Sequence, residues 1–354
     1  MASFIPPMYG VRIVRRIEAK WSRTHAEADQ NANSGQAKGE AFSYPRRSAL
    51  ISGKSMANKI RIGPAGWSYR DWEGVVYPQK PGAKFDPLEY LARFFNAIEI
   101  NSSFYRPFTA STAKSWSSRV AEARDFMFTA KLHRVFTHER GKATAEDETQ
   151  VREGMDVLAG AGKLGALLLQ FPWSFKNTDD ERIYLMNLLD RFKDYPLVLE
   201  IRHSSWNNPQ IYQWLEEVGV GICNVDQPLF KKSIKPGALT TSQIGYVRLH
   251  GRNYQDWFRE KAPRDDRYNY LYSIDELEPW ITRIKDIAAK TRESYVITNN
   301  HFRGQAVVNA LEIKATLNEE RVVGPAPLFK TYPALLESAL PEAGERDVEL
   351  KLFE

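Results

Sequence analysis

From residue 59 onward the sequence alternates eight times between a short run rich in apolar and β-branched residues and, in most units, a stretch with helical periodicity. The predicted strands are residues 59–66, 97–101, 125–133, 165–171, 197–202, 221–226, 245–251 and 294–300. The predicted helices include residues 86–95, 149–161, 179–192, 209–218, 274–290 and 304–317, whereas the sixth connection, QPLFKKSIKPGALTTSQ, allows at most a short helix. This order predicts an α/β protein with a (β/α)8 TIM barrel, and a doubly wound open sheet is the alternative.

The predicted barrel occupies residues 59–320, between an extension of residues 1–58 and a C-terminal tail, residues 321–354, which packs on the barrel or trails from it. The net charge of +5 belongs to the extension, because residues 1–58 hold nine Lys or Arg against four Asp or Glu (9 − 4 = +5) and the rest of the chain holds 40 of each. With few large apolar residues and little periodicity, the extension is predicted to be disordered or dispensable. It is interpreted as a nucleic-acid-binding arm, a transit sequence, or residues upstream of a translation start at Met56.

Missing motifs argue against several common classes of protein. No apolar stretch approaches the length of a membrane span and no signal peptide follows the start, so we expect a cytoplasmic protein without a membrane partner. The single cysteine, Cys223, lies in the apolar run VGVGICNVD, which predicts a buried structural thiol. GAGKLGA resembles a phosphate-binding loop, but Leu164 replaces the required Ser or Thr. The sequence also lacks a dinucleotide fingerprint, a His-Glu-x-x-His helix and a Gly-x-Ser-x-Gly elbow, and no cofactor is predicted.

The strand LVLEIR, residues 197–202, begins as an apolar run and ends in charge. Alternation along a strand places Glu200 and Arg202 on the same face as Val198, which we interpret as the interior of the barrel. The same alternation predicts polar inward residues on the other strands: Arg61, Glu99, Asn101, Thr129, Lys131, His133, Asn224, Asp226, Arg248, His250, Thr298 and Asn300.

Two interpretations of this polar interior compete. In the first, Arg61, Glu99, Glu200 and Arg248 form a mutually neutralising layer, because a buried charge is costly unless it is paired. In the second, the last residues of the strands form a site, because active sites of such barrels lie at the carboxyl ends of the strands. The residues expected to converge there are Asn101, Lys131, His133, Gln170, Arg202, Asp226, His250 and Asn300.

Aromatic residues follow many of the predicted strand ends. They include Trp67, Tyr69, Trp72, Phe104, Tyr105, Trp173, Trp206, Tyr254 and Trp257. Aromatic faces beside cations suit a sugar ring or nucleobase with an anionic group, and we predict that Trp67, Tyr105 and Trp206 contact substrate. The alternative is that the rings cap the barrel and pack against one another. The segment 252–273 is long enough to act as a lid.

Six motifs carry a resemblance to a known family. IRIGPAGWSYRDWEGVVYP, EINSSFYRPF, LLLQFPWSF, LEIRHSSW, YVRLHGR and YVITNNHFRGQAVVNA follow one another from about residue 60 to residue 316. Together they resemble the YecE-like family, catalogued as domain of unknown function 72. The resemblance implies a TIM barrel whose mouth is built from these motifs, with no settled activity. The family's usual Gly-Thr-Ser-Gly-Trp type of opening is here Gly63, Pro64, Ala65, Gly66 and Trp67, so no hydroxyl contribution is expected from that loop.

We hypothesise an enzyme that acts on a small anionic sugar, nucleotide or related metabolite by acid/base hydrolysis or isomerisation. Lys131 and Arg202 would hold the anion, Asn101 and Asn300 would recognise hydroxyl groups, and the acid/base group would be Glu200, Asp226, His250 or Lys131. His133, Gln170 and Arg248 complete the predicted substrate-binding set.

Two alternatives stay open at this point. A divalent-metal-dependent phosphoesterase or isomerase would use Glu200, Asp226 and His250 as ligands, although the neighbouring Lys131, Arg202 and Arg248 oppose a cation. A non-catalytic barrel would bind a ligand or, less favourably, nucleic acid through its aromatic and basic loops. The sequence leaves the oligomeric state open.

Overall fold

Eight parallel strands form one sheet in the computed structural model, which describes residues 59–255, 259 and 266–343. The strands are β1 (Lys59–Pro64), β2 (Ala97–Ile100), β3 (Met127–Lys131), β4 (Leu164–Gln170), β5 (Leu197–Glu200), β6 (Gly221–Asp226), β7 (Ile244–Leu249) and β8 (Glu293–Thr298). Their order is β1-β8-β7-β6-β5-β4-β3-β2, so every strand lies beside its neighbours in the chain and β1 also pairs with β8. This confirms the predicted TIM barrel. The predicted extension, residues 1–58, lies outside the described residues, as does much of the predicted lid, including Trp257.

The ring closes between β1 and β2 through a narrow seam. Ala65 forms a parallel bridge with Glu99, and the Gly66 amide donates to the Glu99 carbonyl over 2.8 Å. Below this bridge the side chain of Asn96 accepts from the Ile62 amide at 2.8 Å and donates to the Ile60 carbonyl at 3.3 Å, so it replaces backbone pairing. An open doubly wound sheet has no such closure.

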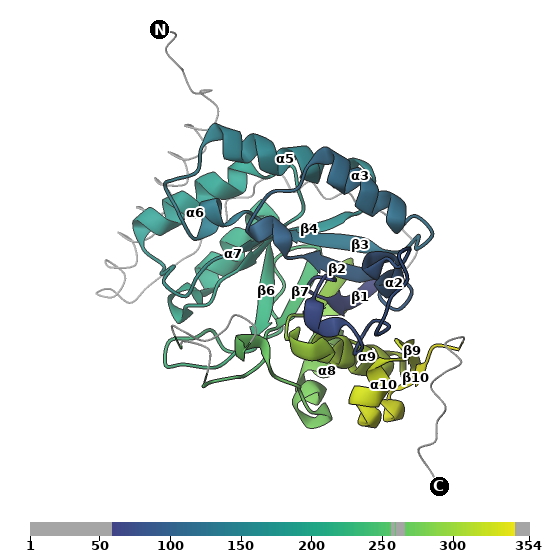
Figure 1. The fold of residues 1–354 in the computed structure, drawn as a ribbon. Coiled ribbons are helices and arrows are strands. Elements are labelled where there is room, and N and C mark those ends of the chain that lie inside the picture. Colours follow the sequence, from purple (N-terminus) through teal and green to yellow (C-terminus); the bar gives the residue numbers. More distant parts are fainter. Residues whose placement is uncertain (1–58, 256–258, 260–265, 344–354) are drawn as a thin grey trace, which may run out of the picture. The chain divides into compact units, whose positions relative to one another are not determined.

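Helices cover the outside of the sheet (Figure 1). They are α2 (Pro87–Ala92), α3 (Ala110–Arg119), α4 (Arg134–Thr137), α5 (Ala145–Gly160), α6 (Asp179–Arg191), α7 (Pro209–Val218), α8 (Ile274–Ala288) and α9 (Gln305–Asn318). Short 3-10 turns follow several strand ends: η1 (Arg70–Trp72), η2 (Ser102–Phe104), η3 (Ser204–Trp206), η4 (Asp266–Tyr268) and η5 (Phe302–Gly304). Residues 227–243, between β6 and β7, contain no helix, as the irregular sequence of that connection predicts.

Local sequence signals explain where several helices begin. The Asp86 side chain caps α2 by accepting from two backbone amides, with Pro87 at the first helical position. Thr144 with Asp147 and Ser273 with Glu276 form capping boxes at α5 and α8. These caps fix where the three helices begin.

After α9 the chain forms a small unit from two short parallel strands, β9 (Val322–Gly324) and β10 (Ala339–Pro341), with α10 (Leu328–Thr331) and η6 (Pro333–Glu337) between them. Gly324 lies against Leu311 of α9 and near Phe329 of α10. An ion pair of 2.7 Å joins Glu342 to Arg93 beyond α2. Residues 321–343 therefore pack against the outer helices.

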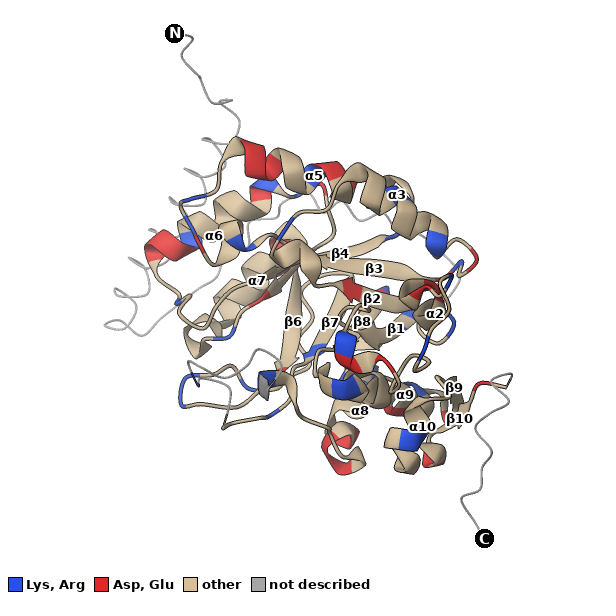
Figure 2. Ribbon diagram, viewed as in Figure 1, with Lys and Arg blue, Asp and Glu red and all other residues tan. Residues whose placement is uncertain are grey.

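The barrel interior contains a buried, mainly apolar cluster, which two tyrosines enter. Its buried cluster contains Ala65, Ala97, Ala166, Leu168, Val198, Cys223, Val225, Tyr246, Tyr295 and Ile297. Strand β4 carries no charge along its length, whereas α5 and α6 carry both signs (Figure 2). No helix among the described residues is long and apolar enough to cross a membrane.

Candidate functional site

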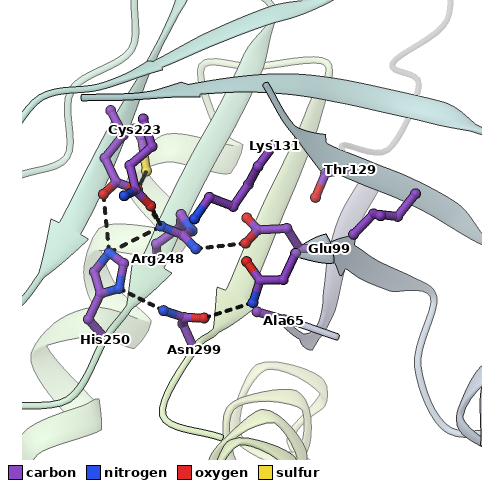
Figure 3. Close-up of polar contacts among 12 residues, drawn as sticks. Ala65, Glu99, Thr129, Lys131, Cys223, Arg248, His250 and Asn299 are labelled. Atoms are coloured by element: carbon purple, nitrogen blue, oxygen red, sulfur yellow. Dashed lines mark hydrogen bonds and ion pairs between the residues drawn. The ribbon is translucent and has the colours of Figure 1, made fainter. Parts of the chain in front are cut away.

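A charged layer lies above the apolar core, with Arg248 of β7 at its centre (Figure 3). One guanidinium nitrogen, Nη2, lies 2.6 Å from Glu99 Oε1, and the other, Nη1, lies 2.5 Å from Glu200 Oε2. Nη1 also donates to Gln170 Oε1 at 2.9 Å, and the Tyr246 hydroxyl lies 3.0 Å from Glu99 Oε2. All three charged side chains are fully buried. This is the neutralising layer that the first interpretation predicts for Glu99, Glu200 and Arg248.

Glu200 also binds a second guanidinium group, that of Arg202. Arg202 donates to Glu200 Oε1 from Nε at 3.0 Å and from Nη2 at 2.9 Å. Burial alone would raise the pKa of Glu200, but Arg248 and Arg202 hold it well below its usual range. Glu200 is therefore a permanent carboxylate, whereas Arg202 keeps 16% of its side chain exposed and brings positive charge to the surface of the mouth.

Lys131, the last residue of β3, projects into the same layer. Its amine points toward the Arg248 guanidinium (Figure 3) and lies 4.2 Å from the centre of the Phe104 ring. Burial, followed by the charge of Arg248, lowers the pKa of Lys131 to about 7, against the opposite pull of Glu99 and Glu200. Lys131 is thus a buried amine that exchanges a proton near neutral pH.

His250 is held in its neutral form beside these charges. Its Nδ1 accepts from the Asn299 amide nitrogen at 3.0 Å, so Nε2 carries the proton and faces Glu200 Oε1 at 3.3 Å. Burial, opposed by Glu200 and reinforced by Arg248, lowers the pKa of His250 to about 3. Asn101 donates to Asn299 Oδ1 at 3.3 Å and continues the network toward β2. His250 is a fixed hydrogen-bonding group and not a base at neutral pH.

The predicted inward placement of Asp226 is wrong. On β6 the residues in the barrel core are Cys223 and Val225, so Asp226 and Asn224 point outward. Asp226 pairs with Arg252 at 2.9 Å, and Arg252 also reaches Glu276 of α8 at 3.1 Å. Asp226 therefore ties the segment after β7 to the outer helix and does not join Glu200 and His250.

The predicted inward placement of Asn300 is also wrong, because the other face of its strand is the inner one. Tyr295, Ile297 and then Asn299 follow the inner face of β8, so Thr298 and Asn300 face the helices. The Asn300 amide donates to Asn309 of α9 at 2.7 Å. Asn299, which our sequence analysis missed, occupies the inner position, and consistent alternation from Tyr295 is the signal that identifies it.

The prediction that Arg61 belongs to the central charged layer is also wrong. Its Nε lies 2.6 Å from Glu293, the first residue of β8, and it contacts the carbonyl of Asp125 before β3. These partners lie at the amino-terminal ends of the strands, opposite the mouth. Arg61 therefore neutralises a separate charge at the other end of the barrel.

Both predicted substrate-binding tryptophans make packing contacts. Trp206 is fully buried, stacks on Phe175 at 4.8 Å and donates from its indole nitrogen to the Phe175 carbonyl. Trp67 packs edge-on against Trp116 of α3 at 5.2 Å and near Phe128, which faces outward from β3. Both rings support the outside of the barrel wall.

The remaining predicted residues lie near the strand ends. Gln170 binds Arg248, as described above, and is partly exposed. His133 Nε2 lies 3.2 Å from the Tyr105 carbonyl, and the Tyr105 side chain is half exposed. The structure thus brings Asn101, Gln170, Glu200, Arg202, Arg248 and His250 into one network, and the Lys131 amine lies within reach of its charges.

The suggested metal ligands do not form a group. Glu200 and His250 are adjacent, but Asp226 is paired with Arg252 on the outer face. Among the residues that the structure describes, no three His, Cys, Asp or Glu side chains lie together in a way that could hold a metal ion. Glu200 is also committed to two guanidinium groups, which compete with any cation for its oxygens.

Comparison with known proteins gives a consistent result. The family model described as "Protein of unknown function DUF72" matches residues 61–331. The UPF0759 protein YunF of Bacillus subtilis (strain 168) is 27% identical over 281 residues, which cover 74% of this chain and 95% of that protein.

Solved structures agree with this match. A DUF72 family protein from Thermotoga maritima is 32% identical, with a TM-score of 0.64, over 73% of this chain and 99% of that chain. Another from Enterococcus faecalis is 26% identical, with a TM-score of 0.63, over 73% of this chain and 95% of that chain. The predicted resemblance is confirmed.

Proposed function

The chain belongs to the DUF72 family of proteins of unknown function, and from that premise we propose that it is an enzyme that binds a small anionic metabolite at the mouth of its barrel and moves a proton with Lys131. The observation that carries this proposal is a single amine with a pKa of about 7 inside a layer of fixed charges. A proton-transfer group works best when its pKa lies near the working pH.

The neighbours of Lys131 cannot share this role near neutral pH. Glu200 remains ionised and His250, with a pKa of about 3, remains neutral. Asp226 is turned away from the layer. We therefore assign proton transfer to Lys131 and supporting roles to Glu200, which binds Arg202 and Arg248, and to His250, which faces Glu200.

The charge of the layer favours an anionic substrate. Glu99 and Glu200 balance Arg202 and Arg248, so the protonated form of Lys131 adds one positive charge. A phosphate or carboxylate near Arg202 would stabilise that charge, and the amides of Gln170 and Asn101 suit hydroxyl groups of a sugar or related metabolite. Isomerisation fits better than hydrolysis, because one group that alternates between base and acid is sufficient for it.

Proton transfer can be detected without knowledge of the product. We would incubate the protein in D2O with sugar phosphates, nucleotides and hydroxy or keto acids, with and without a metal chelator, and follow loss of C–H signals and new products by NMR. We expect exchange or turnover with one class of anion, lost in Lys131→Met and weakened in Arg202→Ala.

Lys163→Met is the matched control. The Lys163 amine also has a lowered pKa, but it binds the Ala123 and Phe126 carbonyls at the opposite end of the barrel, so its loss should leave exchange unchanged. Activity that survives Lys131→Met would contradict the proposal. Salt-sensitive binding of oligonucleotides without any turnover would instead favour the non-catalytic barrel.

A further inference from the structure

The backbone of Lys131 is clamped so that its side chain enters the layer in one direction. The Ser103 hydroxyl donates to the Lys131 carbonyl at 2.7 Å and accepts from its amide at 3.1 Å. The side chain then passes the face of Phe104, which itself packs edge-on against His138 at 4.8 Å. Burial, followed by the charge of Lys131, lowers the pKa of His138 to about 4, so this wall is uncharged at neutral pH.

The Lys131 amine is also available as a nucleophile. Both carboxylates of the layer are occupied by guanidinium groups, and within the described part of the chain the Lys131 amine forms no hydrogen bond and no ion pair. Lys163 and Lys314 differ, because backbone carbonyls accept hydrogen bonds from both of their amines. A desolvated lysine beside another cation is one recognised arrangement for covalent catalysis with carbonyl substrates.

We propose that Lys131 forms an imine with the carbonyl carbon of a small aldehyde or ketone that carries a carboxylate or phosphate group. This inference rests on the proposed function and narrows its substrate class to anionic carbonyl compounds. Arg202, at the exposed edge of the layer, would hold the anionic group while the carbonyl carbon reaches the amine.

The step is balanced without an oxidant or reductant. The Lys131 nitrogen lone pair attacks the carbonyl carbon, and one amine proton passes through water to the carbonyl oxygen to give a carbinolamine. The hydroxyl group then takes a proton from solvent and leaves as water while the nitrogen forms the C=N bond. The net change is amine plus carbonyl plus one proton to protonated imine plus water. The positive charge of the imine makes the adjacent C–H more acidic, and the nearby carboxylates of Glu99 and Glu200 favour the cationic form.

Reductive trapping tests this directly. The full-length protein would be incubated at pH 7.5 with sodium cyanoborohydride and glyoxylate, pyruvate or dihydroxyacetone phosphate, with uncharged acetone as the control compound, and the adduct would be located by peptide mass mapping. At this pH a lysine with a pKa of about 7 holds several hundred times more neutral amine than an ordinary lysine. We therefore expect at least one anionic compound to label Lys131 about a hundredfold faster than the exposed lysines of the protein, and also faster than Lys163, whose amine is held by backbone carbonyls.

Two variants keep the test independent of folding. Lys131→Arg keeps the charge and Lys131→Met keeps the length, and each should abolish the adduct at this position while the melting temperature shows that the protein is folded. No adduct with any anionic compound, or labelling of Lys131 no faster than of Lys163, would overturn the imine. If D2O exchange nevertheless depends on Lys131, the proposed function stands without covalent catalysis. If exchange is also absent, both fail.

Discussion

Replacement of Arg248 by Met should destabilise the fold strongly, because it leaves two buried carboxylates without their shared cation. Arg248 lies 2.6 Å from Glu99 and 2.5 Å from Glu200, and all three side chains are inaccessible to solvent. Glu200 keeps Arg202, so the main loss falls on Glu99, whose remaining partner is the Tyr246 hydroxyl. Removal of one partner from a buried ion pair costs about 3–5 kcal/mol. For a barrel of this size we expect the melting temperature to fall by roughly 6–12 °C.

Urea unfolding followed by circular dichroism at pH 7.5 would measure this loss. The matched control is Arg61→Met, because the partners of Arg61, Glu293 and Asp125, are partly exposed at 25% and 67%, and we expect a loss of only about 1 kcal/mol. Addition of Glu99→Gln to Arg248→Met should restore about 2 kcal/mol, because it removes the unpaired charge. A loss no larger than that of Arg61→Met would refute the reasoning.

Three further predictions concern titration and packing. The pKa of Lys131 is about 7 in the folded state and 10.5 in the unfolded state, so the free energy of unfolding of the wild type should rise as the pH rises from 7 to 10.5. Lys131→Met lacks this buried amine and should be more stable than the wild type at pH 7. Urea unfolding should show this difference shrinking toward pH 10. His250, whose pKa is lowered to about 3, should show no imidazole titration by NMR between pH 8 and 5, and its contribution to stability should be lost only as the pH falls from 6.5 through 3. Gly63→Ala would place a Cβ 1.8 Å from the Ala97 carbonyl oxygen, and it should lower the free energy of unfolding by about 3 kcal/mol or more in the same assay. The control is Gly237→Ala, whose nearest neighbours lie at 3.8 Å and which should cost less than about 1 kcal/mol.

The Lys131 network also shows why buried charge in this barrel is compatible with function. A barrel interior filled only with apolar residues would leave a lysine at the end of β3 without charged neighbours. Here the fixed charges of Glu200 and Arg248 surround the amine, and burial with Arg248 lowers its pKa to about 7 while the carboxylates pull in the opposite direction. The neutralising layer and the candidate site, which our sequence analysis treated as competing interpretations, are therefore one structure.

The amino-acid sequence by itself determined the order of strands and helices, because hydrophobic periodicity and capping residues are local signals. It also predicted that Glu200 and Arg202 point inward, because they alternate along the strand with the apolar Leu199 and Ile201. The irregular connection after β6 was visible in the sequence as well.

Only the tertiary structure decided which face of β6 and β8 is the inner one. Alternation divides a strand into two faces, but when both faces carry polar residues near the strand end, local sequence does not identify the interior. Asp226 and Asn300 were therefore assigned to the mouth, and Asn299 was missed. The pKa of Lys131 was equally beyond local reasoning, because it arises from burial and from charges on β2, β5 and β7, which are far apart in the chain and meet only when the barrel closes.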